Sequence, residues 1–323
     1  MIPKIVLIKD ENNEMTLRIK NCRVSVMNSL RRVLLSEIPM LAFDQICIET
    51  NTGIMNEDML AHRISMIPLC CPQIDYMNFQ EDCACVSGCK RCEINYHLEI
   101  KNNEEEDIGV FCMNLIRDHQ ESNDREESKK IKCTTTSNGI LLARLQKNQE
   151  IKLNAKAIKG KGELHKKWSA INVCYFERET ENSFLFHIEV NDNVRCIDIM
   201  KKAIKILHDK FIILEKKIHL YHNECEKDEY GSPFYHLPYD DTILNILVDY
   251  LIDNYNPPIC FYQRGHFLNE PESKLVVFDD QKTFSFEETD NLIRICINMI
   301  ESTICFMESS MNDIQWGLCV SKK

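Results

Sequence analysis

The stretch "RVSVMNSLRRVLLSEIP", residues 23–39, decides the fold of the N-terminal part of this 323-residue chain. Its apolar residues recur every three or four positions, which is the spacing of one face of an α-helix. Pro39 ends the run, because proline cannot continue a helix. Arg31 and Arg32 fall on or near the polar edge. We therefore predict an amphipathic helix with one buried face, formed by Val26, Met27, Leu30, Val33 and Leu34.

Short strands and one short helix surround this element. Residues 4–10 and 15–20 read as two strands joined by a polar turn, and a third strand, "FDQICIETN", follows the helix. A short helix is predicted to begin near Asn56, and "INYHLEI", residues 94–100, alternates as a strand does. Residues 156–168, "KAIKGKGELHKKW", are predicted to form a basic, glycine-containing loop that either contacts phosphates or an acidic partner or is simply solvated.

Two long amphipathic helices close the two halves of the chain. The first follows the strand at 183–192 and places Ile197, Met200, Ile204, Leu207, Phe211 and Leu214 at near-heptad spacing. The polar, acidic residues 222–233 read as a linker. A further helix over 240–255, two strand-like pieces and a second long helix from about 287 to 311 follow. The repeated order of elements predicts two similar α+β folds in one chain.

Composition excludes several classes of protein. The net charge of −11 argues against binding nucleic acid through a general electrostatic field. No stretch reaches 18 uninterrupted apolar residues, and the start of the chain shows no targeting pattern, so we expect a soluble, intracellular protein without a membrane segment. No nucleophile–base pair, phosphate-binding loop or paired-carboxylate motif stands out, so we expect no catalytic residues.

Four cysteines gather in "EDCACVSGCKRCE", residues 81–93: Cys83, Cys85, Cys89 and Cys92. Unrelated surface thiols and a redox Cys-x-x-Cys pair are two readings of this segment. A tetrahedral Zn²⁺ site is the reading we favour, because short loops between thiolate pairs let the backbone fold around the ion. Gly88 would permit a tight turn, and four thiolates leave no open position, so the site would be structural. Most of the other thirteen cysteines lie in apolar patterns and are expected to be buried.

Four segments of the chain resemble the alpha-type assembly component of multisubunit RNA polymerases, the family that includes the bacterial alpha chain, the archaeal D-type chain and the third-largest chain of eukaryotic polymerase II. "NSLRRVLLSEIP", residues 28–39, looks like its first assembly helix, and "AHRISMIPL", 61–69, follows at the expected distance. "KGKGELHKKWS", 159–169, is similar to the basic loop of the archaeal and eukaryotic members. The long helix at 197–214 falls where the family has its dimerisation helix. The resemblance also implies a zinc loop at the position of the four cysteines.

The C-terminal third resembles the small partner of that component, the archaeal L-type chain. In "DDTILNILVDYL", residues 240–251, Asp241, Thr242, Leu244 and Asn245 are comparable with the partner's opening helix, although aspartate replaces a histidine. One chain that holds both partners is an arrangement of some large DNA viruses, which implies a viral source.

The resemblance implies an α+β fold with four parts. An alpha/D-like assembly domain would comprise residues 1–41 and 179–221, and a β-rich zinc-loop domain, 42–178, would be inserted in it. A linker, 222–233, would lead to a second, L-like assembly domain at 234–323. The two long helices would pack together through an intramolecular dimer interface, formed by Ile197, Met200, Ile204, Leu207 and Phe211 on one side and Leu292, Cys296 and Met299 on the other.

The implied function is that of a non-catalytic assembly platform with one structural Zn²⁺. It would bind the two large catalytic polymerase subunits and a small platform subunit, and would meet DNA or RNA only indirectly. The implied location is the host cytoplasm and virion for a viral source, with the nucleus left open. The rival reading is a zinc-binding regulatory or nucleic-acid-associated protein. The expected docking residues, for which a solvated helix edge or a packed histidine is the plainer alternative, are Asn28, Arg31, Arg32, His62 and Arg63.

Overall fold

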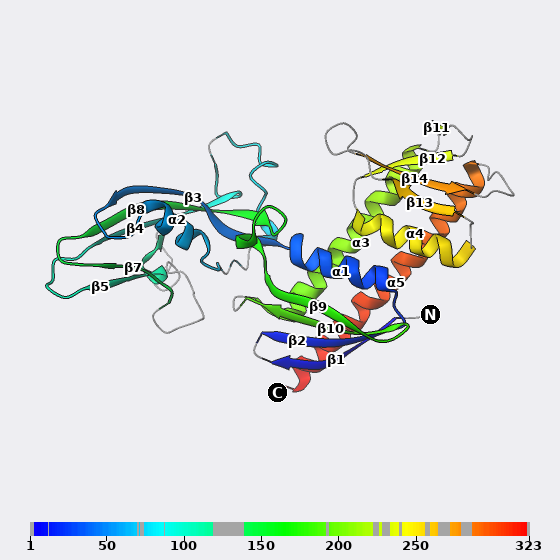
Figure 1. The fold of residues 1–323 in the computed structure, drawn as a ribbon, viewed down its shortest axis with the longest axis horizontal. Coiled ribbons are helices and arrows are strands. Elements are labelled where there is room, and N and C mark those ends of the chain that lie inside the picture. Colours follow the sequence, from blue (N-terminus) through cyan, green and yellow to red (C-terminus); the bar gives the residue numbers. More distant parts are fainter. Residues whose placement is uncertain are drawn as a thin grey trace. The chain divides into compact units, whose positions relative to one another are not determined.

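The structure is a computed structural model of the chain. It describes residues 3–11, 13–69, 71, 74–86, 88–118, 139–191, 194–221, 226–227, 233–238, 241–255, 259–263, 272–278 and 286–321. The chain forms two compact units, whose elements are labelled in Figure 1. The helical unit comprises residues 1–34, 173–188 and 196–323, and the sheet unit comprises 35–172 and 189–195.

The helical unit contains two four-stranded sheets. The first has the order β1-β2-β10-β9, formed by β1 (Lys4–Glu11), β2 (Glu14–Lys20), β10 (Ser183–Val190) and β9 (Ile171–Thr180), the last two of which extend into the sheet unit. The second has the order β11-β12-β14-β13, formed by β11 (Glu226–Lys227), β12 (Pro233–Pro238), β14 (Glu272–Phe278) and β13 (Ile259–Gln263). Every pairing for which a register is known in these sheets is antiparallel.

Four helices of the described residues belong wholly or mainly to this unit: α1 (Val24–Ser36), α3 (Cys196–Tyr221), α4 (Asp241–Tyr255) and α5 (Phe286–Ser321). Helix α3 contacts α5, and it also contacts β2 of the first sheet and β12 of the second. Helix α5 contacts β1 and α4. Each long helix therefore contacts a sheet that lies far from it in the sequence, which ties the N-terminal and C-terminal halves into one unit.

The sheet unit is built around strand β8. Its main sheet has the order β3-β8-β4-β6, formed by β3 (Pro39–Asn51), β8 (Glu150–Lys161), β4 (Glu93–Lys101) and β6 (Ile116–Arg117). Strands β5 (Ile108–Phe111) and β7 (Leu141–Leu145) pair separately, and helix α2 (Glu57–Ser65) contacts β3 and β7. Three 3-10 turns among the described residues complete the unit: Ile74–Tyr76, Cys112–Asn114 and Lys166–Trp168.

The start of α2 follows from its capping residue. Asn56 has extended backbone, and its side chain accepts a hydrogen bond from the Asp58 amide at 2.8 Å. This contact satisfies one of the amides that a helix N-terminus leaves without a partner. The prediction of a helix beginning near Asn56 is therefore confirmed.

The prediction of a basic loop at 156–168 is wrong for its first half. Strand β8 continues to Lys161, and only the residues after it form a turn and a 3-10 helix. Gly160 fits inside the strand because the Trp168 ring lies against it: an added Cβ would come within 2.4 Å of the indole. Glycine in a basic run is typical of a loop, whereas Gly160 makes room for the ring. Strand β9 was also not predicted.

Other predictions have mixed outcomes. Cys112, Cys196, Cys260 and Cys296 are buried as expected, but Cys47 and Cys305 are exposed.

Most of the predicted linker at 222–233 lies outside the described residues. The predicted domain boundaries stay a prediction, although residues 196–323 belong to the same unit as 1–34. Among the helices of the described residues, none is both long and apolar enough to cross a membrane.

Candidate helix seam and metal centre

Helix α3 buries one apolar stripe along its length. Every residue that the sequence places at the interface on this helix is at most 5% exposed: Ile197, Met200, Ile204, Leu207 and Phe211. The spacing of three and four residues keeps these side chains on one side of the helix. Helix α3 contacts α5 and both sheets, so we take this stripe as the part of α3 that belongs to the core of the helical unit.

Helix α5 buries a stripe that is rotated from the predicted one. Cys296 is buried, but Leu292 is only half-buried and Met299 is 39% exposed. The buried residues of this stripe, of which Cys296 was predicted and the other six lie beside the predicted positions, are Ile293, Cys296, Ile297, Ile300, Ile304, Met307 and Met311. We call these seven residues of α5, together with the five buried residues of the α3 stripe, the helix seam.

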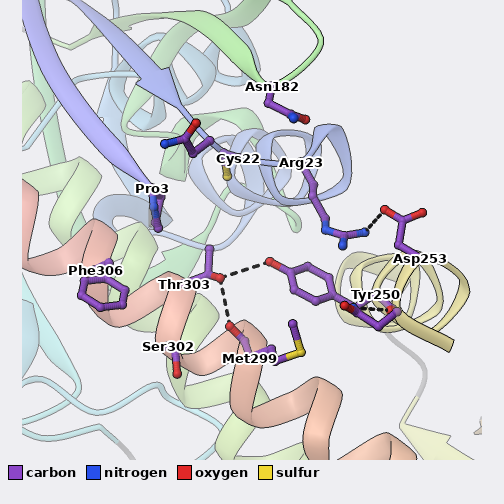
Figure 2. Close-up of a pocket in the computed structure, with 12 residues that line it drawn as sticks. Pro3, Cys22, Arg23, Asn182, Tyr250, Asp253, Met299, Ser302, Thr303 and Phe306 are labelled. Carbon is purple, nitrogen blue, oxygen red and sulfur yellow. Dashed lines mark hydrogen bonds and ion pairs between the residues drawn. The ribbon is translucent and has the colours of Figure 1, made fainter. Parts of the chain in front are cut away.

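A set of polar contacts near the start of α1 was not predicted (Figure 2). The Arg23 guanidinium lies 4.1 Å from the centre of the Tyr250 ring and 2.5 Å from a carboxylate oxygen of Asp253. It also donates to the Asp249 backbone carbonyl at 3.0 Å. The signal in the sequence was the placement of Asp249 and Asp253 four residues apart, which puts both carboxylates on one face of α4.

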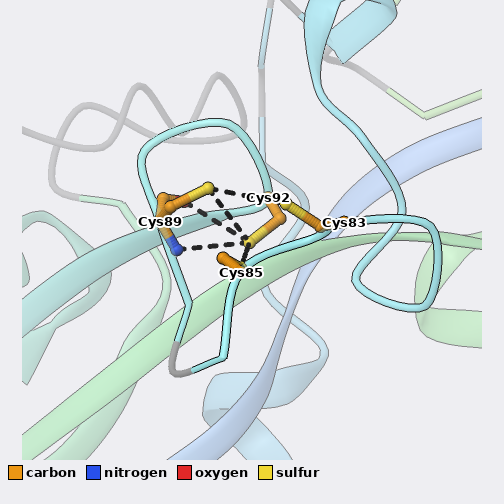
Figure 3. A group of neighbouring side chains, drawn as sticks. All are labelled: Cys83, Cys85, Cys89 and Cys92. Atoms are coloured by element: carbon orange, nitrogen blue, oxygen red, sulfur yellow. Dashed lines mark hydrogen bonds between the residues drawn. The ribbon is translucent and has the colours of Figure 1, made fainter.

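The four cysteines of residues 83–92 converge on one point (Figure 3). Their sulfurs all lie within 4.8 Å of one another. Three pairs are 3.5–3.7 Å apart: Cys83 with Cys89, Cys85 with Cys92, and Cys89 with Cys92. Four thiolates at about 2.3 Å from a tetrahedral Zn²⁺ would stand about 3.8 Å apart. The cluster therefore has the donor set and the size of a four-thiolate metal site.

The backbone around the cluster is folded tightly. The amides of Cys92 and Glu93 both donate to the Cys89 carbonyl, at 2.9 and 3.0 Å. The Cys89 amide points to the Cys92 sulfur at 3.3 Å, an arrangement that stabilises a thiolate. Gly88 has φ +92°, which L side chains rarely adopt, and an added Cβ would lie 2.3 Å from the Glu93 carboxyl. The expected role of Gly88 in a tight turn is confirmed.

The thiols of Cys83 and Cys92 differ in acidity. A backbone hydrogen bond at Cys85, helped by neighbouring thiols, lowers the pKa of Cys83 to about 7. Burial raises the pKa of Cys92 to about 12. A bound cation would have to displace the proton from Cys92, because metals take cysteine as thiolate. A metal ion held by this cluster would therefore be bound less tightly as the pH falls.

The predicted docking residues fall into two groups. Asn28, Arg31 and Arg32 lie half-buried on α1, and Arg31 donates to the Asn28 side-chain oxygen at 2.9 Å. His62 and Arg63 are exposed on α2 in the sheet unit, where Arg63 donates to the Leu141 carbonyl at 2.7 Å. Their role in docking stays a prediction.

A sequence model of the RNA polymerase Rpb3/Rpb11 dimerisation domain matches residues 16–211. The chain belongs to this family. The match begins in β2, includes the sheet unit and ends within α3. Residues after 211, with α4 and α5, lie outside it.

Named relatives agree with the family. The chain is 30% identical over 175 residues to DNA-directed RNA polymerase II subunit rpb3 of Dictyostelium discoideum. This alignment covers 54% of the present chain and 57% of the relative. The chain is 33% identical over 175 residues to the RPB3 subunit of Schizosaccharomyces pombe, covering 53% and 58%. An archaeal subunit, Rpo3 of Archaeoglobus fulgidus, is 26% identical over 212 residues, covering 65% and 72%. The chain thus spans less than two thirds of the two polymerase II relatives.

Proposed function

We propose that this chain is a non-catalytic assembly subunit of a DNA-directed RNA polymerase, in which an alpha/D-like part and an L-like part are fused. The observation that carries the proposal is the helix seam. Helix α3, which the family match reaches, contacts α5 of the C-terminal third, and both bury an apolar stripe. Family membership and the names of the relatives favour this role over a zinc-dependent regulatory protein.

Fusion would change how the platform forms. A short tether holds two partners at an effective concentration on the order of millimolar. The two halves would therefore associate as soon as both have folded, without a search for a separate partner. The platform would then bind the two large catalytic subunits and a small platform subunit, and would perform no chemistry itself. A viral source would place it in the host cytoplasm and virion.

The four-cysteine cluster would hold one structural Zn²⁺. The sulfur separations support four-thiolate coordination, and such a site leaves no position for water or substrate. The ion would brace the loop between the 3-10 turn at Ile74–Tyr76 and strand β4. It would contribute to local folding and not to catalysis.

Co-purification tests the proposed function. A tagged copy of the chain, expressed in its native source and isolated gently, should bring down two large polymerase subunits in stoichiometric amounts. Reversal of both predicted docking charges, Arg31→Glu with Arg32→Glu, should reduce the recovery of the large chains. Guanidinium groups at an interface lose their partners when their charge is reversed.

A matched control separates docking from a general charge effect. Lys4 and Lys20 are exposed and lie opposite each other on β1 and β2. Lys4→Glu with Lys20→Glu changes the net charge by the same amount and should leave recovery unchanged. Recovery of the tagged chain without large partners would refute the assembly role, and equal loss in both double variants would refute docking through Arg31 and Arg32.

A further inference from the structure

Arg23 joins the N-terminal half to α4 through three different kinds of contact. Its guanidinium stacks over the Tyr250 ring, pairs with the Asp253 carboxylate and donates to the Asp249 carbonyl. The Arg23 side chain is 24% exposed and that of Asp253 is 60% exposed, so water screens their ion pair more than it weakens the contacts of Arg23 with the Tyr250 ring and the Asp249 carbonyl. A planar guanidinium can make all three contacts at once, whereas a lysine ammonium lacks the flat face and the fork.

Neighbouring hydroxyl groups extend the same interface. The Ser25 hydroxyl donates to the Asp249 carboxylate, and the buried Ser29 hydroxyl donates to the Thr242 carbonyl at 2.7 Å. On the other side of the ring, the Tyr250 hydroxyl lies 3.1 Å from Thr303 of α5 (Figure 2). The Ser29 hydroxyl is buried, so a placement of α4 that left it without a partner would be costly.

We infer that Arg23 determines which helix the N-terminal half accepts as its partner. The accepted helix carries two acidic residues four positions apart with a tyrosine after the first, as Asp249, Tyr250 and Asp253 do in α4. Apolar stripes such as the helix seam tolerate sliding and exchange, because the hydrophobic effect has no direction. The Arg23 contacts depend on direction and distance, so they fix the position of α4 along and around its axis. This inference rests on the proposed pairing of two fused halves and names what makes that pairing specific.

A charge exchange in the intact chain tests the inference. Hydrogen exchange is measured for the α4 amides in four forms: the unchanged chain, Arg23→Asp, Asp253→Arg and the double variant. Arg23→Asp places a third carboxylate beside Asp249 and Asp253 and should speed exchange in α4 by about tenfold to a hundredfold. The double variant restores one pair of opposite charges and should recover at least half of the lost protection on a logarithmic scale.

Milder variants keep the test decisive if a charge reversal prevents folding. Arg23→Met retains the apolar stem and loses the charge, and Asp253→Asn neutralises the carboxylate. If Arg23 acted only by packing, Arg23→Met would protect α4 as well as arginine does. Arg18→Met is the matched control, since it removes the bidentate pair with Glu179 on the first sheet without touching α4.

Two results would overturn the inference. One is α4 exchange in Arg23→Met that equals exchange in Arg18→Met. The other is strict additivity of the Arg23 and Asp253 changes, which would show that the two side chains do not act together. Because these measurements use the isolated chain, they can fail while co-purification with the large subunits succeeds, and the proposed function would then stand without this specificity.

Discussion

Cutting the chain between its halves should leave them associated. A protease site placed between Asp228 and Gly231, and cleaved after folding, removes the tether but none of the helix seam. The seam comprises twelve buried side chains, five on α3 and seven on α5. If half of them lose their burial on separation, the apolar contribution is about 9–18 kcal/mol. Contacts of α4 with α5 and of α5 with β1 add to it.

The opposing costs are similar in size to the contribution of the seam alone, so the added contacts of α4 with α5 and of α5 with β1 tip the balance toward association. Association of two bodies costs roughly 4–15 kcal/mol in lost freedom of motion. Falling from a millimolar effective concentration to a micromolar protein concentration favours separation by a further factor of about a thousand, or about 4 kcal/mol. The fragments should therefore elute together in size-exclusion chromatography at micromolar concentration. Separate elution of fragments that remain folded would refute the seam.

A single substitution should then separate the fragments. Leu207 is 1% exposed, so Leu207→Asp removes an apolar side chain and puts a carboxylate without a partner into the seam. A cost of about 3–5 kcal/mol would weaken association by about a hundredfold to several thousandfold. Ile213→Asp is the matched control, because Ile213 lies on the same helix but is 53% exposed. If both variants elute alike after cleavage, Leu207 does not hold the halves together.

Further predictions concern the cysteine cluster and the sheet unit. Purified protein should contain one Zn²⁺ per chain, and metal analysis of Cys89→Ser with Cys92→Ser should show its loss; less than about half an equivalent in the unchanged protein would contradict the site. Removing the metal with a chelator should abolish hydrogen-exchange protection within residues 75–97 and leave the helical unit protected, because the four ligands lie within ten residues of the sequence. Unfolding of the whole chain would show that the metal site does more than stabilise its own loop. Gly160→Ala should lower the free energy of unfolding by about 1–3 kcal/mol, because the added Cβ would meet the Trp168 ring at 2.4 Å. Gly53→Ala is the control, since its added Cβ would meet only side-chain ends at 3.2 Å or more. Equal melting temperatures for the two variants would argue against the packing of Trp168 on Gly160.

Periodic apolar spacing made most elements predictable. The α1 helix, the start of α2 at Asn56 and both long helices follow from patterns that one face of a helix imposes. The cysteine cluster was found for a similar reason, because its ligands are close in sequence and their chemistry is distinctive. In both cases the information is local.

What the sequence did not reveal depends on which side chains come into contact when the chain folds. Gly160 reads as a loop residue until Trp168 is seen against it, and Met299 fits a heptad on α5 although the buried stripe runs beside it. The Arg23 contacts join residues more than 200 positions apart. Neither spacing nor composition says which helix will lie next to another, so such contacts are visible only in the folded chain.

Charge gives a second reason for α3 to pair with α5 and not with a second copy of itself. Helix α3 carries six lysines against Asp198, Asp209 and Glu215, whereas α5 carries six acidic residues against Arg294. Two α3 helices side by side would both carry a net positive charge, whereas α3 and α5 carry net charges of opposite sign. The match is incomplete, since burial raises the pKa of Glu301 and the nearby charge of Glu215 raises it further. The apolar seam thus supplies most of the free energy of association. Charge and the Arg23 contacts restrict which helices can associate.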